Sequence, residues 1–204
     1  MPPTFVGLTG GIGAGKTEAL AAFQRAGAVT LATDQVVHEL LRADELRTRL
    51  IERWGERVAT AGEIDRGRVA EIVFERPEEL EWLEAELHPL VADRVAAWRA
   101  GLPSDAKLAV VEVPLLFEAG MDGVFDAVVC IVADDRKRDE RTTARGLAGL
   151  EGRGGRQLSQ EEKAARATHV VSNDGTLANL DAKIAELARE LTGDMERGDD
   201  PERE

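Results

Sequence analysis

Five short apolar segments recur along the chain, each followed by a polar stretch or a helical pattern. They are TFVGL (4–8), AVTLAT (28–33), LAVVEVPLL (108–116), DAVVCIVA (126–133) and THVVS (168–172). Each is rich in valine, nearly continuous rather than alternating, and too short for a typical helix. Strands that helices cover on both faces have this pattern. The segments therefore predict a five-stranded parallel sheet.

Helical patterns separate these segments. Leu20 and Phe23 follow the first segment, and a longer run with i, i+3, i+4 spacing lies near the C-terminus. That run comprises Leu177, Leu180, Ile184, Leu187 and Leu191. Strands that alternate with helices predict an α/β, doubly wound core whose ligand binds outside the carboxyl ends of the strands. We expect this core to comprise residues 1–34, 104–135 and 167–193.

Three intervals do not fit the alternation. Residues 35–103 show a nearly continuous helical pattern, broken at WGERVATAGEIDRG and at Pro77 and Pro89, which is too long for a simple crossover and predicts a helical insertion. Residues 136–166 combine seven arginines with the stretch GLAGLEGRGG. Glycines at this density favour a mobile, arginine-carrying lid, and a solvated loop is the alternative. Residues 194–204 are charged without an apolar pattern, and we expect them to be disordered.

Composition narrows the function classes. A net charge of -13 argues against a protein that binds mainly nucleic acid or an anionic membrane, because it would approach either against its own field. No apolar run approaches the ~18 residues of a transmembrane helix, and MPPTFVGL lacks the features of a signal peptide, so we expect a cytoplasmic protein. Nothing marks a self-complementary surface, and a monomer is the default. Cys130, the single cysteine, is expected to be a small buried hydrophobe.

The stretch GLTGGIGAGKT carries the clearest chemistry. Gly10, four further residues, and then Gly15, Lys16 and Thr17 match G-x-x-x-x-G-K-[ST], between an apolar strand and a helical pattern. Such a loop turns backbone N–H groups toward a polyphosphate at the positive end of the following helix. Lys16 would reach the β- and γ-phosphates, and Thr17 would ligate Mg²⁺. The expected nucleotide-binding residues are Gly11, Ile12, Gly13, Ala14, Gly15, Lys16 and Thr17.

The nucleotide is expected to be ATP, because no lysine follows an asparagine and the guanine-reading motif N-K-x-D is therefore absent. Asp34 follows the second apolar segment, where a carboxylate suits a general base or a metal ligand, and also suits a helix N-cap. Glu112 lies inside an apolar strand, where a charge is costly to bury. It suits a second Mg²⁺ ligand or a hydrogen-bond acceptor for the P-loop backbone. Glu118 is expected to be a solvated charge.

His88 precedes Pro89, which biases it toward a helix boundary. A substrate contact is one interpretation of this histidine, and a structural hydrogen bond is the more common one.

Six motifs occur in the order seen in the dephospho-coenzyme A kinase family, and the resemblance covers about Val6 to Leu191. They are GLTGGIGAGKT, TDQVVHEL, GEIDRGRVAEIVF, LEAELHPLV, VEVPLLFEAG and EEKAARATHVVSNDG. The resemblance implies a P-loop kinase that transfers the γ-phosphate of ATP to the ribose 3′-hydroxyl of dephospho-coenzyme A, in the last step of coenzyme A synthesis. It implies that residues 35–103 form the domain that binds this acceptor and that residues 136–166 form the lid.

The resemblance also implies roles on the acceptor side. Asp34 falls on the family's general base, and His88 with Pro89 falls on the H-P pair of the acceptor pocket. Arg66 belongs to a matching D-R pair, and Leu115 in VPLLFE falls among the substrate-binding positions.

On the nucleotide side, Arg141 matches the lid arginine that contacts the phosphates, which makes it a catalytic candidate beside Lys16 and Asp34. Asn173 and Gly175 match the N-x-G turn that borders the adenine. Two departures stand out. The family often has D-A-D where this chain has Ala32, Thr33 and Asp34, and the lid sequence RGLAGLEGRGGRQ is short and rich in glycine. Another small-molecule or nucleoside monophosphate kinase, or a nucleotide-dependent switch, is the alternative.

Overall fold

The computed structural model describes residues 2–60, 62–144 and 157–193. It divides the chain into two compact units, the first formed by residues up to Leu31 together with those from Leu102 onward, and the second by Ala32–Gly101. The predicted disordered tail 194–204, and most of the glycine-rich part of the predicted lid, lie outside the described residues.

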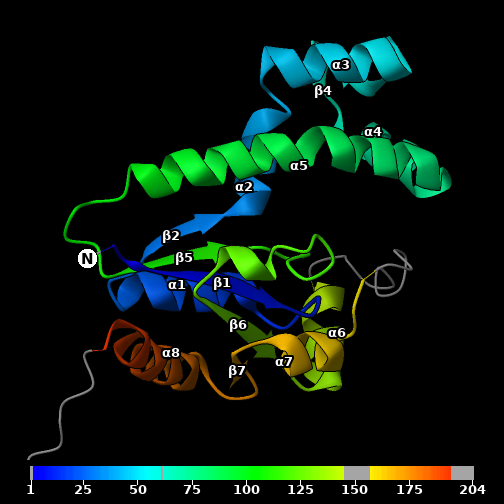
Figure 1. Cartoon of the computed structure of the whole chain (residues 1–204). Coiled ribbons are helices and arrows are strands. Elements are labelled where there is room, and N and C mark those ends of the chain that lie inside the picture. Colours follow the sequence, from blue (N-terminus) through cyan, green and yellow to red (C-terminus); the bar gives the residue numbers. More distant parts are fainter. Residues whose placement is uncertain (1, 61, 145–156, 194–204) are drawn as a thin grey trace, which may run out of the picture. The chain divides into compact units, whose positions relative to one another are not determined.

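The first unit contains a five-stranded sheet in the order β2-β5-β1-β6-β7 (Figure 1). Its strands are β1 (Thr4–Gly10), β2 (Val29–Ala32), β5 (Leu108–Glu112), β6 (Ala127–Val132) and β7 (His169–Ser172). The central strand β1 pairs in parallel with β5 and β6, and β6 pairs in parallel with β7. The five apolar segments thus form one parallel sheet, as predicted. The carboxyl ends of β1, β5, β6 and β7 meet at one edge, where a doubly wound fold binds its ligand.

The helices of the first unit follow the predicted alternation. They are α1 (Lys16–Arg25), the short η2 (Asp122–Val124), α6 (Asp135–Ala144), α7 (Gln160–Arg166) and α8 (Leu177–Thr192). Helices α1 and α8 pack together on one face of the sheet (Figure 1). On α8, Leu180, Ile184 and Leu187 are buried, as their spacing predicts. Leu177 is exposed because it starts the first turn, directly after the cap Thr176.

The centre of the sheet is apolar. Every residue of β5 is buried, and Cys130 on β6 has no exposed surface, which confirms that it is a core residue. Burial raises the pKa of its thiol to about 11, so that the thiolate that a nucleophile requires is disfavoured. In the described part of the chain, no helix is both long enough and apolar enough to cross a membrane.

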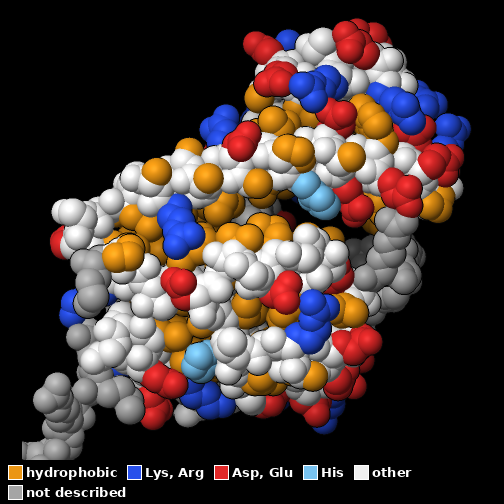
Figure 2. Space-filling model, in the orientation of Figure 1, with side chains coloured by type: hydrophobic (Ala, Val, Ile, Leu, Met, Phe, Trp, Pro, Cys, Tyr) orange, Lys and Arg blue, Asp and Glu red, His pale blue; other side chains and the backbone are white. Residues whose placement is uncertain are grey.

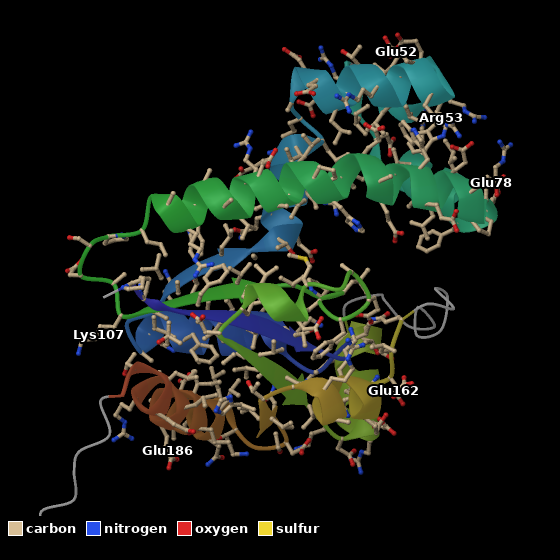
Figure 3. The ribbon with its side chains drawn as sticks, in the orientation of Figure 1. Glu52, Arg53, Glu78, Lys107, Glu162 and Glu186 are labelled. Atoms are coloured by element: carbon tan, nitrogen blue, oxygen red, sulfur yellow. The ribbon has the colours of Figure 1, made fainter. Side chains whose placement is uncertain are left out.

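The second unit consists of helices and one small hairpin. Its elements are α2 (Thr33–Leu40), α3 (Asp44–Trp54), η1 (Glu56–Val58), β3 (Ala59–Thr60), β4 (Glu63–Ile64), α4 (Arg66–Glu75) and α5 (Pro77–Ala100). Acidic and basic side chains are interspersed over its surface (Figure 2). Arg53, labelled on α3 in Figure 3, bonds Glu79 of α5 at 2.9 Å, and the indole of Trp54 donates to the same carboxylate. These two donors lower the pKa of Glu79.

Two helix breaks were predicted in this unit at prolines, and one of them is wrong. Pro77 begins α5, where a missing N–H costs nothing, as predicted. Pro89, however, lies inside α5, and so does His88, so neither marks a helix boundary. A single proline removes one hydrogen bond from a helix interior. Helix α5 has 24 residues, and it is packed on both sides of Pro89 through the buried side chains of Leu83 and Val95. This packing keeps the helix continuous.

Candidate active site

The P-loop, residues 10–17, connects the carboxyl end of β1 to the start of α1, as predicted. Each carbonyl oxygen from Gly10 to Gly15 accepts a hydrogen bond. The ammonium group of Lys16 donates to the carbonyls of Gly10 and Gly11, at 3.1 and 3.0 Å. The carbonyl of Gly15 accepts from the amide of Ala19 inside α1 at 3.0 Å. The cation that would meet a phosphate is thus held on the loop itself.

Side chains from two other elements bind the three middle carbonyls. Arg138 of α6 donates Nε–H to the carbonyl of Ile12 at 3.0 Å. Arg141, one turn later, donates to the carbonyls of Gly13 and Ala14 at 3.2 and 3.3 Å. The side-chain amide of Asn173, directly after β7, donates to the carbonyl of Ala14 at 2.8 Å. The structure therefore brings together Arg141 and Asn173, two residues that the sequence placed at the nucleotide.

The amide groups of the loop are used differently. The N–H groups of Gly13 and Gly15 donate to no other described residue, while the neighbouring carbonyls are all satisfied. Gly13 and Gly15 have φ angles of 74° and 95°, in the left-handed region that favours glycine. A loop that offers N–H groups at the start of a ten-residue helix is an anion site, because the helix dipole adds to the donors.

Glycine is also required here because other elements approach the loop closely. A Cβ on Gly13 would lie 2.7 Å from the carbonyl oxygen of Arg138 and 3.1 Å from Cγ2 of Thr142. A Cβ on Gly15 would collide with the side-chain nitrogen of Asn173. The bonds from α6 and Asn173 to the loop therefore depend on glycine at both positions.

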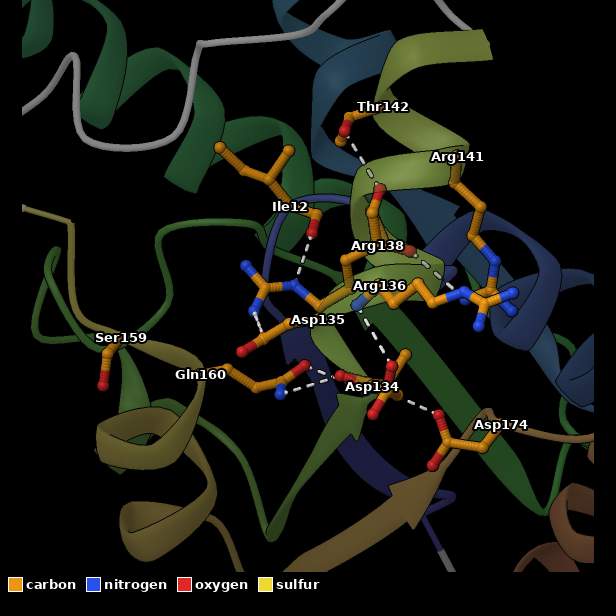
Figure 4. Close-up of polar contacts among 12 residues, drawn as sticks. Ile12, Asp134, Asp135, Arg136, Arg138, Arg141, Thr142, Ser159, Gln160 and Asp174 are labelled. Carbon is orange, nitrogen blue, oxygen red and sulfur yellow. Dashed lines mark hydrogen bonds and ion pairs between the residues drawn. The ribbon is translucent and has the colours of Figure 1, made fainter.

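Asp174, within the predicted adenine turn, ties that turn to the start of α6 (Figure 4). Its carboxylate accepts from the amide of Asp134 at 2.6 Å and from the hydroxyl of Ser172 at 2.8 Å. These bonds, that from Asp134 above all, lower the pKa of Asp174. The ammonium group of Lys137 also binds the carbonyl oxygen of Asp174. Gly175 follows, and a Cβ there would lie 2.9 Å from Oδ1 of Asn179.

Two predicted Mg²⁺ ligands lie at the same sheet edge. Thr17 is exposed in the first turn of α1, and Glu112 ends β5, where it is in register with Leu8 of β1. Glu112 is 8% exposed. Among the described residues, no group of three or more histidine, cysteine or acidic side chains is placed to hold a metal. Mg²⁺ bound with a nucleotide needs only one or two protein oxygens, because phosphates and waters complete its octahedron. One hydroxyl and one carboxylate fit that chemistry.

Except for Leu115, the acceptor-side candidates lie in the second unit. Ala32 occupies the N-cap position of α2, so Asp34 is not the helix cap that its position also suggested. Asp34 lies in the first turn of α2, exposed, and its carboxylate contacts no other described side chain at bonding distance. Such a carboxylate is accessible to a substrate hydroxyl. His88 and Pro89 are exposed on adjacent positions of α5.

Arg66 begins α4, and its guanidinium lies 3.2 Å from Nδ1 of His38. Its neighbour Asp65 caps that helix by accepting from the amides of Gly67 and Arg68 at 3.0 and 3.3 Å. The bond from Arg68, followed by that from Gly67, lowers the pKa of Asp65. The D-R pair thus has a structural aspartate and an exposed arginine. Leu115, in the loop after β5 of the first unit, is 41% exposed.

The expectation that Glu118 is a solvated charge is wrong. Its carboxylate is 11% exposed and pairs at 3.0 Å with Lys163 of α7, whose side chain is fully buried. Lys163 also donates to the carbonyl of Pro114 at 2.7 Å, and Glu118 accepts from the amide of Leu158 at 3.0 Å. These partners are about 40 residues apart or more, so the sequence alone does not reveal the pair.

Arg138 and Asp174 were also missed. Arg138 lies three residues before Arg141 on the same helix, and this spacing alone places both arginines on one face of α6. Asp174 lies inside the N-x-G turn that was already singled out. In both cases the residue lies next to a predicted one in the sequence or on the same helix face, which could have drawn attention to it. The backbone groups that they bind, the Ile12 carbonyl and the Asp134 amide, carry no sequence pattern.

Comparison with known proteins gives a consistent result. The family model described as dephospho-CoA kinase matches residues 4–179. A dephospho-CoA kinase from Deinococcus radiodurans is 37% identical over 193 residues, which cover 93% of each chain. A crystal structure from Thermus thermophilus has a TM-score of 0.78 at 32% identity, covering 94% of this chain and 99% of that one. A dephospho-CoA kinase structure from Campylobacter jejuni has a TM-score of 0.69 at 25% identity, covering 94% and 98%.

The family model spans well over half of the chain, and the Deinococcus relative matches it nearly end to end. The fold and the phosphate-binding loop agree with that match. This chain belongs to the dephospho-CoA kinase family.

Proposed function

We propose that this protein transfers the γ-phosphate of ATP to the ribose 3′-hydroxyl of dephospho-coenzyme A, the last step of coenzyme A synthesis. The observation that carries the proposal is the family match over residues 4–179, which includes the P-loop. ATP and dephospho-coenzyme A are the proposed substrates. We expect the protein to act in the cytoplasm, as a monomer, and without a nucleic acid or membrane partner.

The first unit would bind ATP. The N–H groups of Gly13 and Gly15 would donate to the phosphates, and Lys16 would exchange its bonds to the carbonyls of Gly10 and Gly11 for the β- and γ-phosphates. The transferred group passes through a loose transition state in which charge must be neutralised. We assign Arg141 to this task, which requires it to exchange bonds with loop carbonyls for phosphate oxygens. Asn173 and Gly175 would border the adenine.

Thr17 and Glu112 would hold Mg²⁺. When bound, the ion neutralises charge on the β- and γ-phosphate oxygens. The contribution of the protein is one exposed hydroxyl and one largely buried carboxylate at the edge of the sheet.

The acceptor would be bound by the insertion, residues 35–103, with contacts from Arg66, His88 and Pro89, and by Leu115 of the core. Asp34 would take the proton of the 3′-hydroxyl. A loose transition state does not require a strong base, so an ordinary carboxylate at this position is sufficient. Residues 136–166 would close over the phosphates and exclude water, which prevents hydrolysis of ATP in place of transfer.

The proposal is tested by measuring ADP release from purified protein with ATP and Mg²⁺. Dephospho-coenzyme A, AMP and shikimate are supplied separately as acceptors. We expect release that depends on dephospho-coenzyme A and a product that is heavier by one phosphoryl group. Equal or greater turnover with AMP or shikimate would assign the chain to a different small-molecule kinase reaction. ADP release that no acceptor changes would point to a nucleotide-dependent switch.

A further inference from the structure

Arg138 is a largely buried arginine in contact with the P-loop, and the roles proposed above do not use it. Its side chain is 15% exposed. Nε donates to the carbonyl of Ile12 at 3.0 Å, and Nη1 pairs with the carboxylate of Asp135 at 2.8 Å (Figure 4). The guanidinium is thus fixed between its own helix and the loop.

The helix that carries Arg138 is itself anchored. The amide of Asp134, just before α6, donates to the carboxylate of Asp174 at 2.6 Å, and the guanidinium of Arg141 donates to the carbonyl of Asn173 at 3.0 Å. Gly13 allows this helix to approach, because a Cβ there would lie 2.7 Å from the carbonyl of Arg138. Arg138 therefore reaches the loop from a helix that is bonded to the turn after β7.

The carbonyl of Ile12 and the N–H of Gly13 belong to the same peptide group. In a trans peptide these two groups point in opposite directions across a rigid plane. A donor that holds the Ile12 carbonyl toward α6 therefore turns the Gly13 N–H away from α6. That N–H donates to no other described residue. The direction of one phosphate-binding donor is thus set by a side chain more than 120 residues away.

We propose that Arg138 is a positioning residue for ATP, which acts through the Ile12–Gly13 peptide to aim the Gly13 N–H at the phosphates. The proposal rests on the assignment of the P-loop as the ATP site. Arg138 itself does not touch the nucleotide. Without it, the Ile12 carbonyl is free to rotate into the cradle, where it would repel a phosphate oxygen.

The test compares Arg138→Ala and Arg138→Lys with Arg136→Ala. Arg136 is on the same helix, 86% exposed, and pairs with Glu140 at 3.0 Å. The dissociation constant of Mg-ATP is measured by calorimetry without acceptor, the two KM values are measured with dephospho-coenzyme A, and the free energy of unfolding is measured in urea. The ATP titration needs no turnover, so it decides the role of Arg138 even if the wild-type protein does not phosphorylate dephospho-coenzyme A.

We expect Arg138→Ala to bind ATP about tenfold more weakly, a change of ~1.4 kcal/mol, and to raise KM for ATP without changing KM for the acceptor. Arg138→Lys should recover part of the affinity, because an ammonium group retains a donor. Arg136→Ala should match the wild type. The proposal is overturned if Arg138→Ala binds ATP as tightly as Arg136→Ala does. It is also overturned if both KM values rise together with a loss of stability that the lysine variant does not relieve.

Discussion

The side-chain nitrogen of Asn173 lies 2.8 Å from the carbonyl oxygen of Ala14, which joins the end of β7 to the loop after β1. The Ala14 carbonyl shares its peptide group with the N–H of Gly15. Asn173 therefore sets the direction of the Gly15 N–H, as Arg138 does for that of Gly13. Two of the phosphate-binding donors are aimed by side chains from distant parts of the chain.

Gly15→Ala tests how far this contact depends on glycine. Gly15 has a φ of 95°, and the added Cβ would collide with Asn173. Gly27→Ala is the matched control, because Gly27 has a φ of 90° and open space around it. Both variants should lose about 1–2 kcal/mol of stability from the left-handed backbone. Only Gly15→Ala should also lose ATP binding, by calorimetric titration. Equal ATP affinity in the two variants would show that the contact with Asn173 is dispensable.

Lys163→Met should destabilise the protein strongly. Lys163 is fully buried, and its loss leaves the charge of Glu118 without its partner. One oxygen of the Glu118 carboxylate already has no hydrogen-bond partner among the described residues. Breaking a buried pair in this way costs about 3–5 kcal/mol. Arg166→Met is the control, since its pair with Asp122 at 3.5 Å is about half exposed and should contribute less than ~1 kcal/mol.

Urea unfolding of both variants measures these costs. Addition of Glu118→Gln to Lys163→Met should restore part of the lost stability. If Lys163→Met were no less stable than Arg166→Met, the buried pair would make no net contribution to the free energy of unfolding.

Asp174 should make stability depend on pH in the acid range. Its pKa is lowered in the folded protein, chiefly by the Asp134 amide and then by Ser172. A carboxyl with a depressed folded pKa stabilises the fold above its unfolded pKa of about 3.9, and that contribution is lost as pH falls through the folded value. Asp174→Asn should therefore flatten the fall in the free energy of unfolding below about pH 4. A slope identical to that of the wild type would mean that Asp174 does not contribute to acid unfolding.

Asp34→Asn separates binding from transfer. Asparagine keeps the shape of the exposed side chain and removes its capacity to accept a proton, so kcat should fall by about 100-fold or more while ATP affinity is unchanged. Glu39→Gln, an exposed acid on the same helix α2, is the control and should retain wild-type turnover. Wild-type turnover in Asp34→Asn would rule out the general-base assignment.

The strands and the P-loop were predictable because their signals are local. Valine-rich runs such as 127–132 identify buried strands without knowledge of their partners, and Gly15, Lys16 and Thr17 have a fixed spacing. The tendency of proline to end helices gave a wrong prediction at Pro89. There the packing of a long helix outweighs one lost hydrogen bond.

Contacts to the loop could not be predicted in the same way. Arg138 and Asn173 act on backbone carbonyls of residues 12 and 14, which carry no sequence signal. The pairing of Glu118 with Lys163 likewise depends on the fold that brings α7 to the loop after β5.

Transfer of the phosphoryl group to the ribose 3′-hydroxyl, and not to the 2′-hydroxyl, can be measured directly. The most direct test supplies ATP and Mg²⁺ with dephospho-coenzyme A, with its 2′-deoxy analogue or with its 3′-deoxy analogue, and measures the mass of each product. We predict a gain of one phosphoryl group for dephospho-coenzyme A and the 2′-deoxy analogue, and none for the 3′-deoxy analogue. Phosphorylation of the 3′-deoxy analogue, or no phosphorylation of dephospho-coenzyme A, would rule out the proposed transfer to the 3′-hydroxyl.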